Sequence, residues 1–137
     1  ESLPGGFCEP AVPVLSCVTG DFGYSATNSR AILRRWVDEP QRLWDVMQGM
    51  LEAGVETVIN VGPQPNIIPS TLSRLKSNVS AQIEAGGLTG LGLKAVSQLV
   101  ARRMWLVNLL TEDAVLLRAP HVEQLSLEDW LLEQSVP

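Results

Sequence analysis

Hydrophobic residues recur every three or four positions over several stretches of the chain, and this spacing predicts amphipathic helices. The clearest case is a helix over residues 40–51. Its apolar face comprises Leu43, Trp44, Met47, Met50 and Leu51. Pro40 suits the first helical position, and Gly54 is placed to end the helix as a left-handed cap. We therefore expect these large side chains to form core rather than a cofactor site.

The same spacing predicts helices before and after this one. One runs from the cap residue Asn28 to about Val37, with an apolar stripe of Ile32, Leu33, Trp36 and Val37. Another follows Asn66, carries Pro69 in its first turn and extends to about Val79. Further helical segments are predicted at 93–100 and 104–110. A last helix follows Ser126, which opens a sequence close to a capping box.

Short apolar runs predict strands at 14–18, at 56–61 and at 114–117. The run at 56–61 is rich in β-branched residues, as in a central strand, and lies between two predicted helices. Helix, glycine, strand, tight loop and helix in succession are typical of an α/β fold with parallel strands. Ligands in such folds bind at the carboxyl ends of the strands. The loop 62–66 occupies that place, although a Gly-Pro turn after a strand is also a common structural feature.

The character of the chain changes after residue 79. Residues 85–92 contain four glycines and predict a hinge or linker. The predicted organisation is a first segment over 1–79, a glycine-rich linker over 80–92 and a mostly helical extension over 93–137.

Composition and charge exclude several classes of protein. The 137 residues carry a formal net charge of −5, which argues against a nucleic-acid partner. No apolar run approaches the roughly 18 to 20 residues that span a bilayer, so no membrane partner is expected. The two cysteines, Cys8 and Cys17, are too few for a disulfide scaffold and favour a reduced, cytoplasmic setting.

Few residues offer catalytic chemistry. His121 is the single histidine, and no Gly-x-Ser-x-Gly elbow, HExxH or CxxC motif is present, so we expect no metal and no cofactor. A dinucleotide-like string, Gly90-Leu91-Gly92-Leu93-Lys94-Ala95, follows a polar segment instead of a strand, and a flexible entry to a helix explains it better. Arg30, Arg34 and Arg35 are interpreted as a solvated helix face.

Three motifs occur in the same order and spacing as in the C-terminal part of one enzyme family. Pro13-Val14-Leu15-Ser16-Cys17-Val18-Thr19-Gly20 is similar to "PVISNVTA". Leu33-Arg34-Arg35-Trp36, with Pro40 and Trp44, is similar to "LVRQL…P…W". Residues 53–63, AGVETVINVGP, are similar to "QGVDTFVEVGPG". Over 11–79, about half of the chain, the sequence thus resembles malonyl-CoA:acyl carrier protein transacylases and related acyltransferase domains.

The resemblance implies a fragment of an α/β-hydrolase-like acyltransferase: a partial three-layer α/β sheet with flanking helices, followed by the helical extension. In the family, a serine in a Gly-x-Ser-x-Gly elbow takes malonyl from coenzyme A, a histidine acts as base, and an arginine holds the malonyl carboxylate. All three precede the matched segment, and His121 lies after it, so no catalytic side chain is carried over and the chain alone is expected to be inactive.

Two features of the family's site do map onto this chain. A backbone carbonyl in the "LVRQ" helix orients the family's histidine, and it corresponds to Trp36 or, with a shift of one residue, to Arg35. The strand-end loop places Gly62, Pro63, Gln64 and Asn66 in the wall of the substrate site.

The leading hypothesis is therefore a fragment of an acyl carrier protein S-malonyltransferase of fatty acid synthesis, with malonyl-CoA and acyl carrier protein as partners of the intact parent. The alternative is a non-catalytic binding module on an acyltransferase-like scaffold. A nucleotide-binding protein that uses residues 90–95 ranks third. Open sheet edges also predict a homo-oligomer, unless the C-terminal helices cover them.

Overall fold

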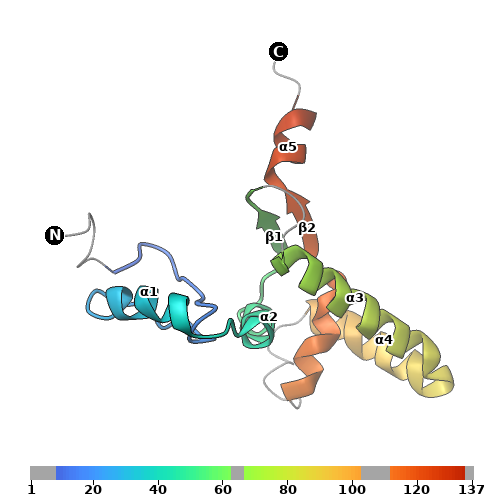
Figure 1. The fold of residues 1–137 in the computed structure, drawn as a ribbon. Helices are drawn as coiled ribbons and strands as arrows, with labels where there is room; N and C mark the ends of the chain where they lie inside the picture. The colour runs from blue at the N-terminus through green and yellow to red at the C-terminus, as the bar shows by residue number, and fades with distance from the viewer. Residues whose placement is uncertain (1–8, 63–66, 103–111, 135–137) are drawn as a thin grey trace. The chain divides into compact units, whose positions relative to one another are not determined.

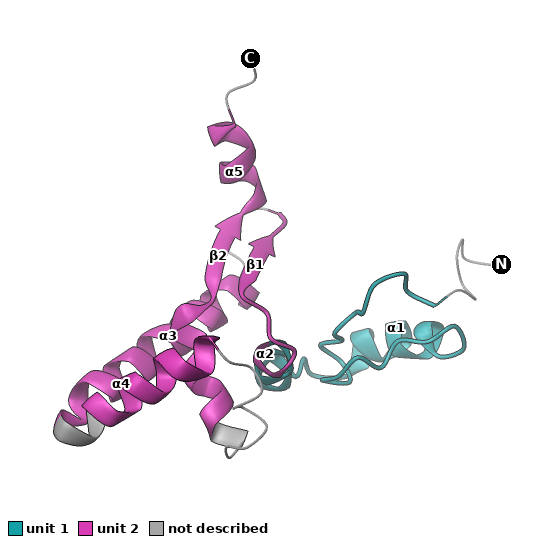
Figure 2. Cartoon of the chain, turned by 180° about the vertical axis from the view of Figure 1, so that it is seen from behind, with its two compact units in different colours: residues 1–50 teal, residues 51–137 magenta. Residues whose placement is uncertain are grey.

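The computed structural model describes residues 9–62, 67–102 and 112–134. The chain divides into two compact units, residues 1–50 and residues 51–137, which Figure 2 shows in different colours. This division falls within the second helix, whereas the sequence analysis places the first segment's end after residue 79.

The beginning of the first unit is organised by a buried serine. Ser16 Oγ accepts hydrogen bonds from the amides of Val18 (3.2 Å) and Thr19 (3.4 Å), and the Ser16 amide donates to the carbonyl of Asp21 (2.9 Å). Gly20 has a φ of 78°, which closes the turn. The predicted strand at 14–18 is therefore wrong: the serine side chain satisfies the backbone locally in place of a neighbouring strand.

Helix α1, Ser29–Asp38, confirms the first predicted helix (Figure 1). Asn28 does not cap it with its side chain; the amide group instead bridges the Ser25 amide (2.7 Å) and the Gly23 carbonyl (2.7 Å). Of the predicted apolar stripe only Ile32 is buried, while Leu33, Trp36 and Val37 are exposed.

Helix α2, Leu43–Glu52, confirms the strongest helix prediction but begins three residues after Pro40. Val46, Met47, Met50 and Leu51 are buried, whereas Trp44 is exposed. Gly54 ends the helix as expected: its φ is 81° and its amide donates to the Leu51 carbonyl at 3.2 Å.

A helical hairpin dominates the second unit. Helix α3, Ile67–Ala85, is followed after the single residue Gly86 by α4, Gly87–Arg102, and the two lie side by side (Figure 1). A 3₁₀-helix, η2, Glu112–His121, packs against both. Their shared core comprises Leu72, Leu75, Val79, Val100, Val115, Ala119 and Val122.

Two corrections concern this hairpin. Residues 80–92 are the end of α3 and the start of α4 and not an irregular glycine-rich linker. The predicted strand at 114–117 is part of η2. The helix predicted at 104–110 lies outside the described residues.

The described residues contain two strands, β1, Thr57–Asn60, and β2, Glu123–Ser126, which pair in parallel with Thr57 opposite Glu123. Side chains fasten β2 to α3: Gln124 Nε2 donates to the Pro69 carbonyl (3.2 Å), Ser73 Oγ donates to Gln124 Oε1 (2.9 Å), and Lys76 Nζ donates to the Val122 carbonyl. Since the amide of Gln124 has distinct donor and acceptor ends, these contacts fix the register of β2 on the helix.

The last helix is short. Helix α5, Leu127–Glu133, begins at the predicted cap, where Ser126 Oγ accepts from the Asp129 amide at 3.4 Å. Its large apolar side chains Trp130 and Leu131 are exposed.

The predicted fold class, a partial three-layer sheet of an α/β-hydrolase-like acyltransferase, is therefore wrong for this structure. The described chain is mostly helical and its sheet has two strands, too few to form the central layer between two layers of helices. Among the helices of the described residues, none has the length and apolar character needed to cross a membrane.

Candidate functional site

The first predicted site element is the loop that leaves β1. Gly62 has a φ of 119°, a conformation that L side chains rarely adopt, and a Cβ atom there would meet no atom within 4 Å. Any other residue at this position is thus disfavoured by backbone strain and not by collision. Of the predicted wall residues, Pro63, Gln64 and Asn66 lie outside the described residues, so Gly62 alone can be placed.

The second predicted element is a backbone carbonyl at the end of α1, belonging to either Arg35 or Trp36. The Arg35 carbonyl accepts the Glu39 amide at 2.8 Å. The Trp36 carbonyl would pair with the amide of residue 40 in a continuing helix, but residue 40 is a proline and has no N–H. Of the two candidate carbonyls, that of Trp36 is therefore the one that can accept a further hydrogen bond.

Proline 40 also explains where α1 ends. A residue before proline avoids the helical conformation, and Glu39 is extended, with ψ at 144°. The Arg35 side chain closes over this end by donating two hydrogen bonds to the Glu39 carboxylate, at 2.7 and 2.8 Å. These hydrogen bonds lower the pKa of Glu39 below its ordinary value. Arg35 is thus engaged locally, whereas Arg30 and Arg34 are exposed, as expected of a solvated face.

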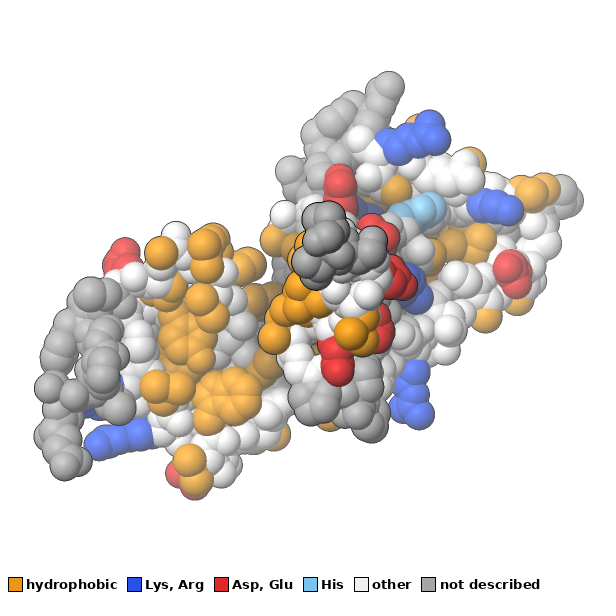
Figure 3. Space-filling view, turned by 90° about the horizontal axis from the view of Figure 1, so that it is seen from above, with side chains coloured by type: hydrophobic (Ala, Val, Ile, Leu, Met, Phe, Trp, Pro, Cys, Tyr) orange, Lys and Arg blue, Asp and Glu red, His pale blue; other side chains and the backbone are white. Residues whose placement is uncertain are grey.

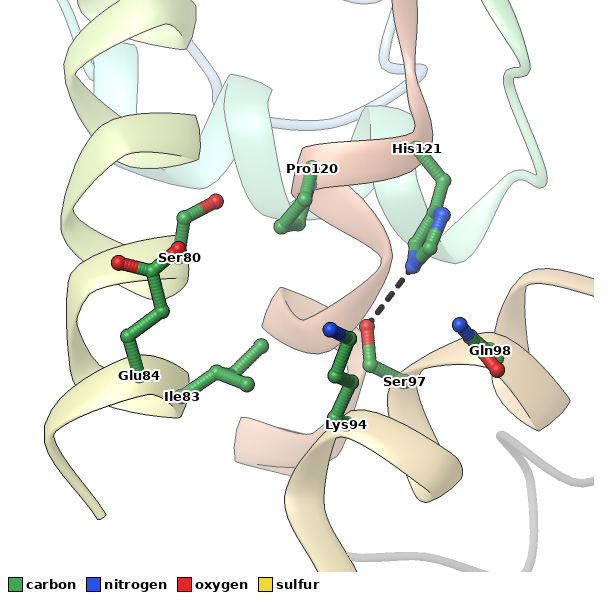
Figure 4. A pocket seen from close by; sticks show the side chains of 8 residues that line it. All are labelled: Ser80, Ile83, Glu84, Lys94, Ser97, Gln98, Pro120 and His121. Carbon is green, nitrogen blue, oxygen red and sulfur yellow. Dashed lines mark hydrogen bonds between the residues drawn. The ribbon is translucent and has the colours of Figure 1, made fainter. Parts of the chain in front are cut away.

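A pocket of about 160 Å³ lies in the second unit, between the helical hairpin and η2 (Figure 4). Helix α3 contributes Ser80, Ile83 and Glu84, helix α4 contributes Lys94, Ser97 and Gln98, and η2 contributes Pro120 and His121. The sequence analysis singled out His121 but did not associate it with this set. No spacing in the sequence signals the pocket, because its residues come from three elements that only tertiary packing brings together.

A buried serine and the single histidine meet in this pocket, as the dashed line in Figure 4 marks. Ser97, which is 2% exposed, has its Oγ 2.9 Å from His121 Nε2 and 2.7 Å from the Leu117 carbonyl oxygen. A carbonyl can only accept, so the hydroxyl proton of Ser97 is directed to Leu117 and His121 Nε2–H is the donor to Ser97.

This direction of hydrogen bonding bears on catalysis. A serine nucleophile must give its proton to the histidine, which requires the opposite arrangement. In this arrangement the hydrogen bonds of Ser97 hold η2 on α4.

Arg118 is a second buried polar residue that the sequence analysis missed. It is 3% exposed; its Nη1 donates to the Leu51 carbonyl and its Nη2 lies 3.5 Å from the Val55 carbonyl oxygen, while its Nε has no partner among the described residues. Desolvation lowers the pKa of Arg118, and the nearby Glu56 carboxylate opposes that change. The guanidinium thus satisfies carbonyls on both sides of the Gly54 turn and fixes η2 to the chain segment that leads into β1.

Other candidate chemistry finds no support in the described part of the chain. No group of three His, Cys, Asp or Glu side chains there is arranged to hold a metal ion. The string at residues 90–95 lies inside α4 and follows a helix, so it lacks the strand-to-helix turn that a dinucleotide-binding loop requires. Comparisons with protein-family models, curated proteins and solved structures found no match to this chain.

Proposed function

We propose that this chain is the C-terminal segment of a malonyl-CoA:acyl carrier protein transacylase and that it positions the reacting groups without supplying them. In the parent, a serine outside residues 1–137 attacks the malonyl thioester, coenzyme A leaves as the thiol, and the malonyl group then passes to the phosphopantetheine thiol of acyl carrier protein. The proposal starts from the three sequence motifs, whose order and spacing over 11–79 resemble those of the family.

The observation that carries the proposal is the carbonyl of Trp36. In the family, a backbone carbonyl at the end of this helix orients the catalytic histidine. Pro40 has no N–H, so the amide that would otherwise pair with the Trp36 carbonyl is missing. A second support is Gly62, whose positive φ at the end of β1 is a backbone conformation that other residues rarely adopt.

Exposed apolar side chains in β1 and directly after it also favour a place within a larger protein. Ile59 and Val61 are 58% and 72% exposed, whereas parallel strands are normally covered on both faces. We further propose a cytoplasmic setting, in keeping with Cys17, which is a free thiol.

The test is to incubate the full gene product with malonyl-CoA and to locate any malonyl ester by peptide mass spectrometry. We expect one adduct, on a serine in a Gly-x-Ser-x-Gly elbow outside residues 1–137. An adduct on a serine within residues 1–137, or a full gene product without such an elbow, would show the proposal to be wrong.

A substitution tests the role of the carbonyl itself. Pro40→Ala restores an amide that can pair with Trp36 as α1 extends, so in the full gene product it should lower kcat for malonyl transfer while KM for malonyl-CoA changes little. Gln41→Ala, at the exposed neighbouring position, is the matched control and should leave both constants unchanged.

The non-catalytic alternative stays a second candidate because the pocket in the second unit is lined by side chains able to bind a ligand, while the Ser97 hydroxyl donates its proton to the Leu117 carbonyl. A full gene product that forms no malonyl ester under any condition favours this alternative.

A further inference from the structure

The pocket between α3, α4 and η2 has opposite charges on opposite walls. Glu84 belongs to α3 and Lys94 to α4, and Figure 4 shows the carboxylate on the α3 side and the ammonium group on the α4 side. Both residues are exposed, and within the described ranges neither takes part in an ion pair. Each charge is therefore available to a ligand.

The wall between these charges is partly apolar. Ile83 and Pro120 are both half-buried, and the Ser97–His121 hydrogen bond holds the imidazole ring in place beside them. The volume of about 160 Å³ is close to that of an engineered protein cavity of roughly 150 Å³ that holds benzene. A ligand that fills the pocket thus has on the order of six to ten non-hydrogen atoms.

We propose that this pocket binds a free α-amino acid with a small aliphatic side chain. Glu84 accepts hydrogen bonds from the ligand's ammonium group, Lys94 donates to its carboxylate, and the side chain lies against Ile83 and Pro120. A dicarboxylate of the same size would place a negative charge near Glu84, and a diamine would place a positive charge near Lys94, so the charge pattern selects a zwitterion. The inference uses α3, α4 and η2 and does not rest on the proposed transferase function.

Isothermal titration calorimetry on the whole chain tests the ligand class with three probes that share a branched aliphatic chain. These are leucine, isocaproate, which lacks the ammonium group, and isoamylamine, which lacks the carboxylate. We expect leucine to bind and each analogue to bind at least about tenfold more weakly, because each loses a charge-assisted hydrogen bond. Absence of leucine binding, or equal binding of leucine and isocaproate, would overturn the proposal.

Two variants test the residues. Lys94→Gln should weaken leucine binding about tenfold and leave isoamylamine unchanged, and Glu84→Gln should weaken leucine similarly and leave isocaproate unchanged. Arg74→Gln on α3 and Glu133→Gln on α5 remove exposed charges away from the pocket and should not alter leucine binding. Far-ultraviolet circular dichroism checks that every variant is folded. Leucine affinity that is unchanged in Lys94→Gln or Glu84→Gln, or lowered equally in the controls, would contradict the assignment.

Discussion

Side-chain hydrogen bonds join η2 and the residue after it to parts of the second unit that are distant in sequence. Ser97 donates to Leu117, Lys76 donates to Val122, and Arg118 donates to Leu51. A 3₁₀-helix and the turns beside it leave carbonyls without regular helical partners, and such groups are costly to bury unpaired. Ser97 and Lys76 therefore hold the η2 segment on the α3–α4 hairpin, and Arg118 holds it on Leu51 at the end of α2.

Removing the Ser97 hydroxyl should measurably destabilise the protein. Ser97→Ala leaves the Leu117 carbonyl and His121 Nε2 without their partner, and we expect the free energy of unfolding to fall by about 1–3 kcal/mol. Urea denaturation followed by circular dichroism measures this loss. The control Ser77→Ala, at an exposed position of α3, should change it by no more than about 0.5 kcal/mol. Equal changes in unfolding free energy in the two variants would mean that the Ser97 hydrogen bonds make no net contribution to stability.

Cys17 provides a pH-dependent prediction. Burial raises the pKa of its thiol above the ordinary value, so the thiolate forms at higher pH in the folded chain than in the unfolded chain. In a Cys8→Ser variant, alkylation by iodoacetamide should be slower in the native protein than in urea at the same alkaline pH. The associated stability is fully present below the unfolded pKa and is lost as the pH rises through the folded pKa. Equal alkylation rates at every pH would contradict this.

Elements with strong helical spacing could be predicted from the sequence, and so could β1, because its run of β-branched residues is a local strand signal. Elements without a local signal, such as η2 and β2, could not. The regular apolar positions of α2 and α3 led to correct predictions. The apolar run at 114–117 is too short for its periodicity to distinguish a strand from a helix. Its packing against α3 and α4 determines that it becomes part of the 3₁₀-helix η2. Strand β2 contains one large hydrophobic residue, Leu125, so its sequence carries no strand signal.

The candidate sites divide in the same way. The turn at Gly62 could be predicted because a Gly-Pro pair after an apolar run marks a chain reversal locally. The contact of Ser97 with His121 could not, because its partners are 24 residues apart and neither has a distinctive neighbourhood in the sequence.

Two glycines of the α3–α4 hairpin should respond in opposite directions to the same substitution. Gly87 has a φ of 56°, so Gly87→Ala should cost about 1–2 kcal/mol of unfolding free energy. Gly92 lies inside α4 with open space around a Cβ atom, so Gly92→Ala should stabilise by about 0.5–1 kcal/mol. Thermal unfolding compares the two variants. A change of the same sign in both would show that the hairpin is not formed as described.

At the scale of the whole molecule, large hydrophobic side chains remain at the surface, and Figure 3 shows several on one face. The formal charge of −5 at pH 7 opposes their association, and the isoelectric point lies near pH 4.8. The homo-oligomer expected from the exposed strands stays a prediction.

Self-association should therefore increase as the pH falls from 7.5 towards 5.5. The net negative charge shrinks as the pH approaches the isoelectric point near 4.8, which reduces the repulsion between copies, while exposed apolar residues such as Ile59 and Val61 are unaffected. Sedimentation velocity at several concentrations measures the effect. Ile59→Lys, which places a charge on the exposed face of β1, should reduce this association and return the protein to the sedimentation coefficient that it has at pH 7.5. A monomer at both pH values would exclude association through this surface.

The contact between Arg118 and Leu51 has a consequence for synthesis on the ribosome. Its partners are 67 residues apart, which corresponds to about 3–13 s of translation at roughly 5–20 residues per second. The α3–α4 hairpin is local and can form as it emerges, but β1 has to wait for β2 and Arg118. During that interval the exposed strand is a natural target for chaperones, so the yield of folded protein should depend on them more than the small size of the chain would indicate.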